Sequence, residues 1–248
     1  MSLPNNRESL GYLINEATAD QHAALEELVM SHFKQCLYPA TSTPLLYAEG
    51  LSYFLIIFRN LELVLQHNND LYDPRLVRTD RLNADVMCIK QDFHVTERRT
   101  RFGEQEWTTV LKDFDKRMGE QLLKMPHLLL AYAWVLYLAI FSGGRYMKAS
   151  LQLSFRDAWL QRIDESKHHD AEDYLRFWIF GDNSQENEEI RSSFKSRFEA
   201  VAETLSTQQQ HEVVIEAGAI MQSLAGVVQE LGVLLKPPQD PATELPSA

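Results

Sequence analysis

A histidine and a carboxylate one helical turn apart are the first residues in this chain that could do chemistry. They are His22 and Glu26, in the segment ATADQHAALEEL at positions 17–28. On a helix, residues four positions apart share one face. A carboxylate that accepts a hydrogen bond from one ring nitrogen fixes the tautomer of an imidazole and makes the other nitrogen a better metal ligand. The pair therefore suits an axial ligand for iron, although an ordinary solvated surface pair has the same spacing.

Two adjacent glycines stand inside a segment that otherwise predicts one apolar helix, YLAIFSGGRYMK at positions 137–148. A glycine in a helix interior costs roughly 0.5–1 kcal/mol relative to alanine. Together with Ala139 and Ser142, Gly143 and Gly144 form a helix face without large side chains, against which a planar ligand could lie. A close crossing of two helices, or a kink at a glycine pair, has the same pattern, and the residues alone do not decide between these interpretations.

Helices must position both groups, because alternating strand patterns and hairpin turn signals are absent from the sequence. The spacing of apolar residues, with prolines between the segments, predicts helices at positions 9–35, 45–67, 80–93, 104–123, 126–151, 170–180, 186–205 and 207–235. We expect one all-α, multi-helical domain over residues 1–235, since no linker or change in composition precedes its end. Residues 236–248 are polar and rich in proline, and we expect a disordered tail there.

The composition excludes some classes of protein. The formal net charge is −11, whereas a general nucleic-acid binder has a basic excess. Cys36 and Cys88 lie in neither a C-x-x-C motif nor a Cys/His zinc spacing, which favours the reducing cytosol over a disulfide framework. The segment between Lys124 and Arg145 has no charged residue. Its unbroken apolar run is shorter than the roughly 20 residues of a membrane span, so we expect a buried core helix.

With both motifs in view, the sequence resembles the heme oxygenases. That family carries its iron-ligating histidine in an AT…H…E segment of the first helix, and an SGG sequence in a distal helix that lies over the heme. Here these segments read EATADQHAALE and YLAIFSGGR. Further similar segments are FRNLELVLQHN (58–68), LRFWIFGDN (175–183) and IRSSFKSRFEAV (190–201). The resemblance extends over roughly positions 10–235, and the SGGR ending with its aromatic distal helix looks most like the fungal branch.

The resemblance implies heme-site roles for His22, Glu26, Gly143, Gly144, Arg191 and Lys195. His22 would bind the iron as the metal ligand, and Glu26 would orient its ring. The backbone of the two glycines would approach the iron-bound oxygen as the catalytic element. The two basic residues would pair with the heme propionates, since exposed carboxylates at a pocket mouth favour cations. Without the resemblance, their segment RSSFKSR is an ordinary solvated helix face.

The activity implied by the resemblance is oxidative cleavage of heme to biliverdin, carbon monoxide and ferrous iron. Heme would be substrate and cofactor together, O2 the oxidant, and NADPH the electron source through a reductase of the cytochrome P450 reductase type. Local basic segments could dock an acidic reductase despite the negative net charge. We expect a cytoplasmic protein, or one on the cytosolic face of the endoplasmic reticulum if a C-terminal anchor is missing from this sequence. No membrane span and no nucleic-acid partner are expected.

The distal helix departs from the family pattern at positions that are usually polar. Leu136 stands where an arginine is common, Ile140 where an aspartate is common, and Phe58 where a tyrosine is common. In typical members, those polar groups hold a distal water chain that delivers protons to the bound oxygen. An isoleucine side chain can hold no water by hydrogen bonds. Two alternatives therefore stay open beside heme cleavage: a heme-binding or heme-sensing protein without turnover, or peroxidase-like chemistry. An unrelated ligand in the same scaffold is the third.

Overall fold

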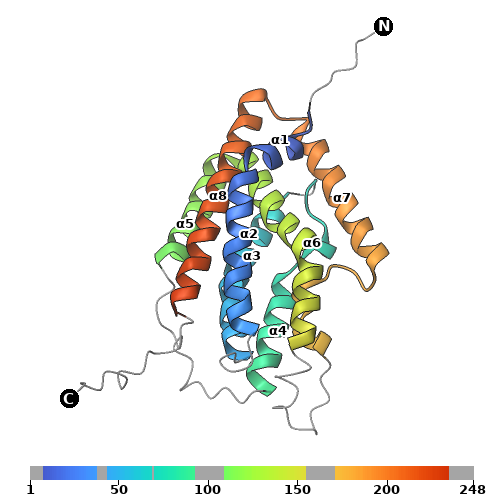
Figure 1. Cartoon of the computed structure of the whole chain (residues 1–248). Helices are drawn as coiled ribbons and strands as arrows, with labels where there is room; N and C mark the ends of the chain where they lie inside the picture. The colour runs from blue at the N-terminus through green and yellow to red at the C-terminus, as the bar shows by residue number, and fades with distance from the viewer. Residues whose placement is uncertain (1–7, 38–43, 69, 93–108, 155–170, 235–248) are drawn as a thin grey trace, which may run out of the picture.

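The protein is a bundle of α-helices, as expected (Figure 1). The computed structural model describes residues 8–37, 44–68, 70–92, 109–154 and 171–234, and within these ranges it contains helices and no strand. The all-α, multi-helical fold class is confirmed. The expected tail at 236–248 lies outside the described residues, and the expected boundary of a single domain at residue 235 stays a prediction.

Eight α-helices and four short 3-10 helices build the bundle within the described ranges. The α-helices are α1 (Leu10–Ala17), α2 (Ala19–Leu37), α3 (Pro44–Leu65), α4 (Thr79–Asp92), α5 (Thr109–Lys124), α6 (Leu129–Ser154), α7 (Ser184–Ala202) and α8 (Thr207–Leu234). The 3-10 helices are η1 (Pro74–Leu76), η3 (Pro126–Leu128), η6 (Ala171–Tyr174) and η7 (Arg176–Trp178).

The first expected helix is two helices, with a break at Thr18. This residue leaves helical geometry at φ −110° and ψ 10°. Its buried hydroxyl donates to the carbonyl oxygen of Ile14 at 2.8 Å, which is the back-bonding that bends helices at threonine. The carbonyl of Thr18 then accepts the backbone N–H of His22 at 2.8 Å. The break therefore places His22 in the first turn of α2.

The expected helix at 170–180 is wrong, because the structure has only the two 3-10 turns η6 and η7 there. Distant side chains take the backbone groups that an α-helix would pair internally. The carboxylate of Asp85 accepts the N–H groups of Arg176 and Phe177 at 3.1 and 2.9 Å. The guanidinium of Arg81 donates to the carbonyl oxygens of Ile179 and Phe180 at 2.6 and 3.0 Å. A segment whose backbone is satisfied in this way gains little from becoming a helix.

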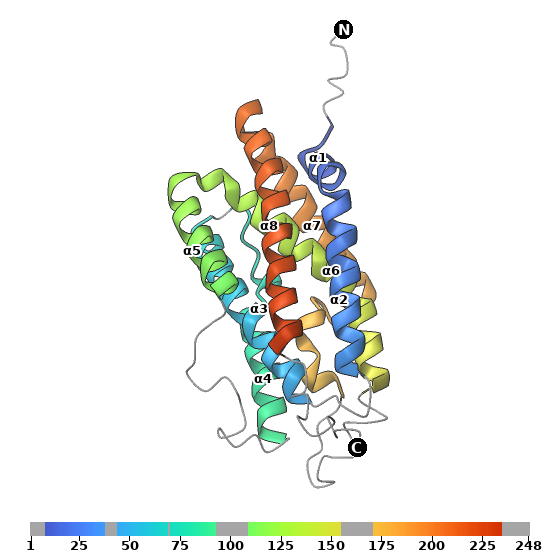
Figure 2. The ribbon, with the colours of Figure 1, turned by 60° about the vertical axis from the view of Figure 1, so that its left-hand side comes forward.

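Helix α8 packs against four other helices, α1, α2, α5 and α6 (Figures 1 and 2). Helix α6 is buried on all sides from Leu129 to Tyr137. Beyond Leu138 one side of α6 is uncovered, and Ala139, Ser142 and Tyr146 are exposed there. The core therefore holds the first half of α6 and leaves one face of the second half, which carries the glycine pair, open.

Two helices have the length and hydropathy of a membrane span, Pro126–Leu153 and Thr207–Leu231. Within their most apolar windows, 72% and 44% of the residues are buried inside the bundle. Core helices of globular proteins meet the same criteria, so length and composition are weak evidence for a membrane here.

Candidate functional site

His22 presents its imidazole on the outside of α2, beside Glu26. The side chain of His22 is 56% exposed and that of Glu26 is 68% exposed. The ring Nδ1 and the Glu26 Oε2 are 4.0 Å apart, which is an ion-pair distance and longer than a hydrogen bond. Among the described residues, the ring has no hydrogen-bond partner. A half-exposed imidazole that makes no hydrogen bond can accept a metal ion without losing an internal contact.

Helix α1 fastens this end of the chain to α6 and α7. The carboxylate of Glu199 on α7 accepts the backbone N–H groups of Leu10 and Gly11 at 3.1 and 3.0 Å, which caps the first turn of α1. The indole of Trp134 on α6 donates to Asn15 Oδ1 at 3.0 Å. A Cβ atom at Gly11 would overlap the Trp134 ring. Glycine is therefore required where α1 crosses α6, a close approach that sequence analysis did not identify.

Helix α2 follows a different course after the break at Thr18. Helix α1 packs against α8 and α7, whereas α2 packs chiefly against α8. Within the described residues, α2 and α6 have no extensive packing with one another. Both α2 and α6 pack against α8. His22 and the glycine pair therefore lie on two helices that share α8 as a packing partner.

Gly143 and Gly144 have different surroundings, although both lie inside an uninterrupted α6. A Cβ atom at Gly143 would have no heavy atom within 4 Å. Gly143 is half-buried, and its neighbour Ser142 is exposed. The α-carbon of Gly143 therefore faces open space at the edge of the uncovered side of the helix, where a ligand could approach the backbone closely.

Gly144 is buried and faces the backbone of η7. A Cβ atom at this position would lie 2.8 Å from the carbonyl oxygen of Trp178 and 3.3 Å from the Cγ2 atom of Ile140. Contacts shorter than 3.0 Å with a backbone atom require the backbone to move. Gly144 therefore serves a close internal packing contact. Of the two interpretations of the glycine pair, the ligand face applies to Gly143 and the close packing contact applies to Gly144.

A buried arginine holds the segment that packs on Gly144. Arg78, just before α4, is completely buried and donates to the carbonyl oxygens of Phe177 and Ile179, while its guanidinium lies 4.0 Å from the centre of the Phe180 ring. Burial lowers the pKa of Arg78 to about 9, so the guanidinium keeps its charge at neutral pH. The carboxylate of Glu62 caps the start of α4 through the Arg78 and Thr79 N–H groups, and burial raises its pKa.

The capping carboxylate Asp85 makes the stability of the fold depend on pH. Burial raises the pKa of Asp85 to about 7, against the effect of its hydrogen bonds to the backbone N–H groups of Arg176 and Phe177. An unfolded aspartate has a pKa of about 3.9, so between about pH 4 and pH 7 the native state binds more protons than the unfolded state. The free energy of unfolding contributed by this group therefore falls as the pH rises through that window.

We expect Asp85→Asn to flatten this pH dependence. Urea unfolding of both proteins at about pH 5 and about pH 7.5 measures the effect, since the variant has no proton to lose at this position. The wild type should lose more stability between the two pH values than the variant. An equal loss in both proteins would show that Asp85 is already ionised at the lower pH.

The departures from the family pattern all lie in the apolar core. Phe58, Leu136 and Ile140 are 2%, 3% and 4% exposed. Phe58 packs against Tyr137 and Phe177, with ring centres 5.9 and 5.5 Å apart. These positions offer no hydrogen bond to a water molecule. Leu136 and Ile140 on α6 and Phe58 on α3 therefore belong to the closed core.

Arg191 lies on α7 beside α6, at a small hollow that Ile140, Phe141, Arg145 and Trp178 also line. The hollow measures about 310 Å³ with its open side included. The Arg191 Nη1 atom is 3.4 Å from Glu188, and its Nε atom is buried without a hydrogen-bond partner in the described part of the chain. This unpaired donor indicates that Arg191 can still bind an anion.

Lys195 lies one helical turn after Arg191 on the same helix and is half-buried. No contact among the described residues joins Arg191 or Lys195 to His22. The six expected site residues therefore lie on three helices: two on α2, two on α6 and two on α7.

No group of three or more histidine, cysteine, aspartate or glutamate side chains that could hold a metal ion occurs in the described residues. His22 has one carboxylate neighbour and no second ligand there. A lone imidazole fits a metal that brings most of its own ligands, as the iron of a heme does. The donor set that is present therefore fits heme: an accessible imidazole, a bare helix backbone at Gly143 and an unpaired guanidinium donor at Arg191.

Comparison with families of known proteins gives a match over most of the chain. The model of the heme oxygenase family matches residues 8–230. No curated protein sequence matches the chain significantly.

Solved structures of heme oxygenases share the fold at low sequence identity. Heme oxygenase from Leptospira interrogans is 19% identical, with a TM-score of 0.69 over 90% of this chain and 100% of that chain. Heme oxygenase-2 from Synechocystis, solved with heme and NO, is 17% identical, with a TM-score of 0.71 over 92% and 87%. Heme oxygenase 2 from Chlamydomonas reinhardtii, solved without heme, is 20% identical, with a TM-score of 0.72 over 90% and 98%.

Proposed function

Because the chain belongs to the heme oxygenase family, we propose that it cleaves heme oxidatively to biliverdin, carbon monoxide and ferrous iron. The observation that carries this proposal is the combination of a family match over residues 8–230 with an exposed imidazole on α2 and an open glycine on α6. Bound heme would supply both the iron that activates O2 and the porphyrin ring that is cleaved.

The residues of this chain would hold heme from two sides. His22 would bind the iron through its Nε2 atom, and Glu26 would keep the ring oriented by moving from its present 4.0 Å separation to hydrogen-bond distance of Nδ1. Gly143 would allow the porphyrin to approach the α6 backbone. Arg191 and Lys195 would pair with the propionates, and the unpaired Arg191 Nε atom supports that role.

Protons would have to reach the site without the usual distal side chains. Ile140 and Leu136 cannot bind water, whereas the exposed hydroxyl of Ser142 and the backbone carbonyls near the glycines can. We propose that these groups, with water entering from the uncovered face of α6, take over the hydrogen bonding that an aspartate and an arginine would otherwise provide.

Electrons would come from NADPH through a reductase of the cytochrome P450 reductase type. The partly exposed Arg191 and Lys195 belong to the basic segment that would meet an acidic partner, while the other basic segment, at 98–101, lies outside the described residues. We further propose a cytosolic location or the cytosolic face of the endoplasmic reticulum. Membership of the fungal branch stays a prediction that rests on Arg145 and the aromatic residues of α6.

The direct test is turnover. The purified chain, loaded with heme, is supplied with the reductase and NADPH in air, and the products are separated and identified. We expect the heme absorption to disappear while a bilin and one equivalent of carbon monoxide form. Heme that stays bound and intact through reduction in air would overturn the proposed activity.

Heme binding without ring opening is the second candidate function. The buried apolar side chains at positions 58, 136 and 140 favour it, because they remove the groups that usually deliver protons. Under the same conditions it predicts a heme spectrum that persists. Peroxidase-like chemistry predicts oxidation of an added phenol by hydrogen peroxide with no bilin, so this second assay separates it from the other two outcomes.

A further inference from the structure

A hydrogen bond from α3 reaches the segment that packs on Gly144. The indole Nε1–H of Trp178 donates to the hydroxyl oxygen of Tyr47 at 2.7 Å. The two residues are 131 positions apart in the sequence. Tyr47 lies in the first turn of α3 and is 8% exposed, and Trp178 is the last residue of η7. An indole has one N–H donor, and here Tyr47 takes it.

The same tryptophan touches α6 through its backbone. Its carbonyl oxygen would be 2.8 Å and its carbonyl carbon 3.6 Å from a Cβ atom at Gly144. The indole of Trp178 is thus bonded to Tyr47, while its carbonyl lies against the backbone of α6 at Gly144. Because the indole and the carbonyl belong to one residue, a displacement of the whole residue relative to Tyr47 would change its distance from Gly144.

The other bonds to this segment hold its neighbours. Asp85 binds the N–H groups of Arg176 and Phe177, and Arg81 binds the carbonyls of Ile179 and Phe180. These bonds fix the segment on both sides of Trp178. Tyr47 adds the bond to the side chain of Trp178, the residue whose carbonyl approaches α6 at Gly144.

The bond does not titrate near neutral pH. Burial and the nearby charge of Asp85 raise the pKa of Tyr47 well above its usual value. Its hydroxyl is therefore neutral under physiological conditions.

We infer that Tyr47 is a positioning residue, which fixes how closely the Trp178 backbone approaches Gly144 and thereby sets the position of the α6 glycine face. The inference rests on the proposed function for the part that concerns heme. A residue of α3 would then help to set the position of the α6 face that carries Gly143 and Gly144. Tyr47 itself need not touch heme.

The first test needs no heme. Gly144→Ala places a methyl group against the Trp178 carbonyl and should lower the urea midpoint. Adding Tyr47→Phe frees the indole and lets the segment retreat, so the double variant should regain part of the lost midpoint. The matched control is Tyr132→Phe, which also removes a buried tyrosine hydroxyl, one that donates to Glu216 at 2.9 Å. It should add its own loss to that of Gly144→Ala.

Recovery by Tyr47→Phe and not by Tyr132→Phe supports the inference. If the Gly144→Ala chain does not fold alone, a folded double variant is the same result. Additive losses with Tyr47→Phe, or a double variant that also fails to fold, would overturn it. These outcomes do not depend on heme, so they stand even if the proposed function fails.

The second test uses the heme complex. Tyr47→Phe and Trp178→Phe should each leave heme affinity within about threefold of wild type, a difference of less than 1 kcal/mol. When the absorption spectrum of the ferric heme complex is followed against pH, both variants should shift the midpoint of its transition by the same amount, about half a pH unit or more. The double variant should match either single variant, because the bond between Tyr47 and Trp178 is absent from all three. Additive shifts, or no shift in any variant that binds heme normally, contradict the positioning role.

Discussion

Replacing His22 by alanine should lower the affinity of the protein for ferric heme by at least about a hundredfold, equivalent to roughly 3 kcal/mol. The imidazole is the only expected protein ligand to the iron. Its ring is 56% exposed and makes no hydrogen bond in the described part of the chain, so its removal should not disturb the fold. The change therefore separates ligation from stability. Heme titration followed by absorption, with the urea midpoint of the apoprotein, measures both.

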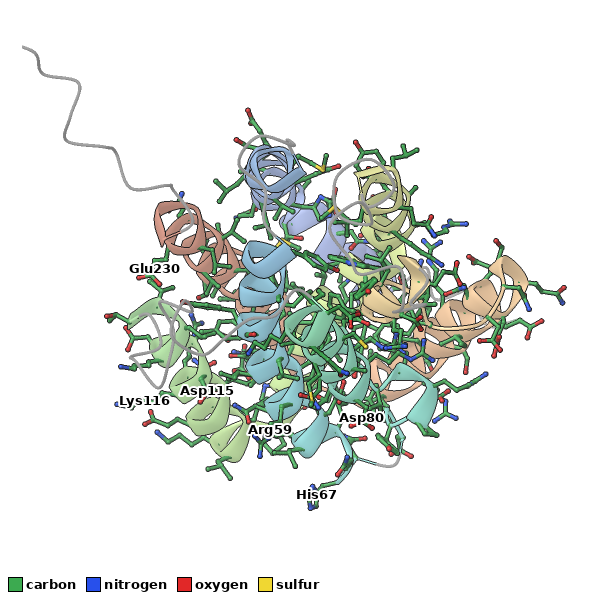
Figure 3. All side chains as sticks on the ribbon, turned by 90° about the horizontal axis from the view of Figure 1, so that it is seen from below. Arg59, His67, Asp80, Asp115, Lys116 and Glu230 are labelled. Carbon is green, nitrogen blue, oxygen red and sulfur yellow. The ribbon has the colours of Figure 1, made fainter. Side chains whose placement is uncertain are left out.

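His67→Ala is the matched control. This histidine ends the turn that follows α3, is exposed, and points outward from the bundle (Figure 3). Its Nδ1 atom contacts only the Leu63 carbonyl, at 2.8 Å, among the described residues. The control variant should bind heme as the wild type does. Equal affinity in the His22 and His67 variants would show that iron is bound elsewhere.

The two glycines should respond in opposite ways to the same substitution. Gly143→Ala should raise the free energy of unfolding by about 0.5–1 kcal/mol, because alanine favours the helix and its methyl group meets open space. Gly144→Ala should lower it by about 1–3 kcal/mol, because the methyl group would overlap the Trp178 carbonyl. Urea unfolding of the two apoproteins measures the difference.

A side chain at Gly143 should be tolerated by the fold but should weaken heme binding. A larger side chain there, as in Gly143→Leu, should leave the apoprotein folded yet reduce heme affinity about tenfold or more, equivalent to roughly 1.4 kcal/mol, because it fills space that the porphyrin would occupy. Gly50→Leu is a suitable control on α3, where a Cβ atom also meets open space. Normal heme affinity in Gly143→Leu would place the ligand on another face.

The helices themselves could be predicted from the spacing of apolar residues. The expected helices at 45–67, 80–93, 186–205 and 207–235 agree with α3, α4, α7 and α8 within three residues at each end. The break at Thr18 could not be predicted with the same certainty. It depends on whether a threonine hydroxyl bonds back to its own helix, and both arrangements suit the sequence.

The roles of the glycine pair depend on contacts from far along the chain. The pair of adjacent glycines predicts that another group approaches the backbone of α6 closely. In the structure this holds for Gly144, which lies against Trp178, whereas Gly143 faces open space. Only the fold brings η7 to α6, so no local pattern could have assigned the two glycines separately.

The segment at 171–180 shows the limit of local patterns most clearly. Its residues suit a helix, yet Asp85, Arg78 and Arg81 pair with its backbone from α4 and the turn before it. An arginine buried completely, as Arg78 is, has no distinguishing signal in the sequence. The sequence likewise gives no sign of the bond between Tyr47 and Trp178, because the two residues are 131 positions apart and no local pattern links them.

A crystal structure of the heme complex would test the central claim most directly, by showing which atoms face the two sides of the porphyrin. The account predicts iron bound to the Nε2 atom of His22, with the α-carbon of Gly143 over the opposite face. Iron bound by a different residue, or heme seated with Gly143 turned away from it, would contradict the account.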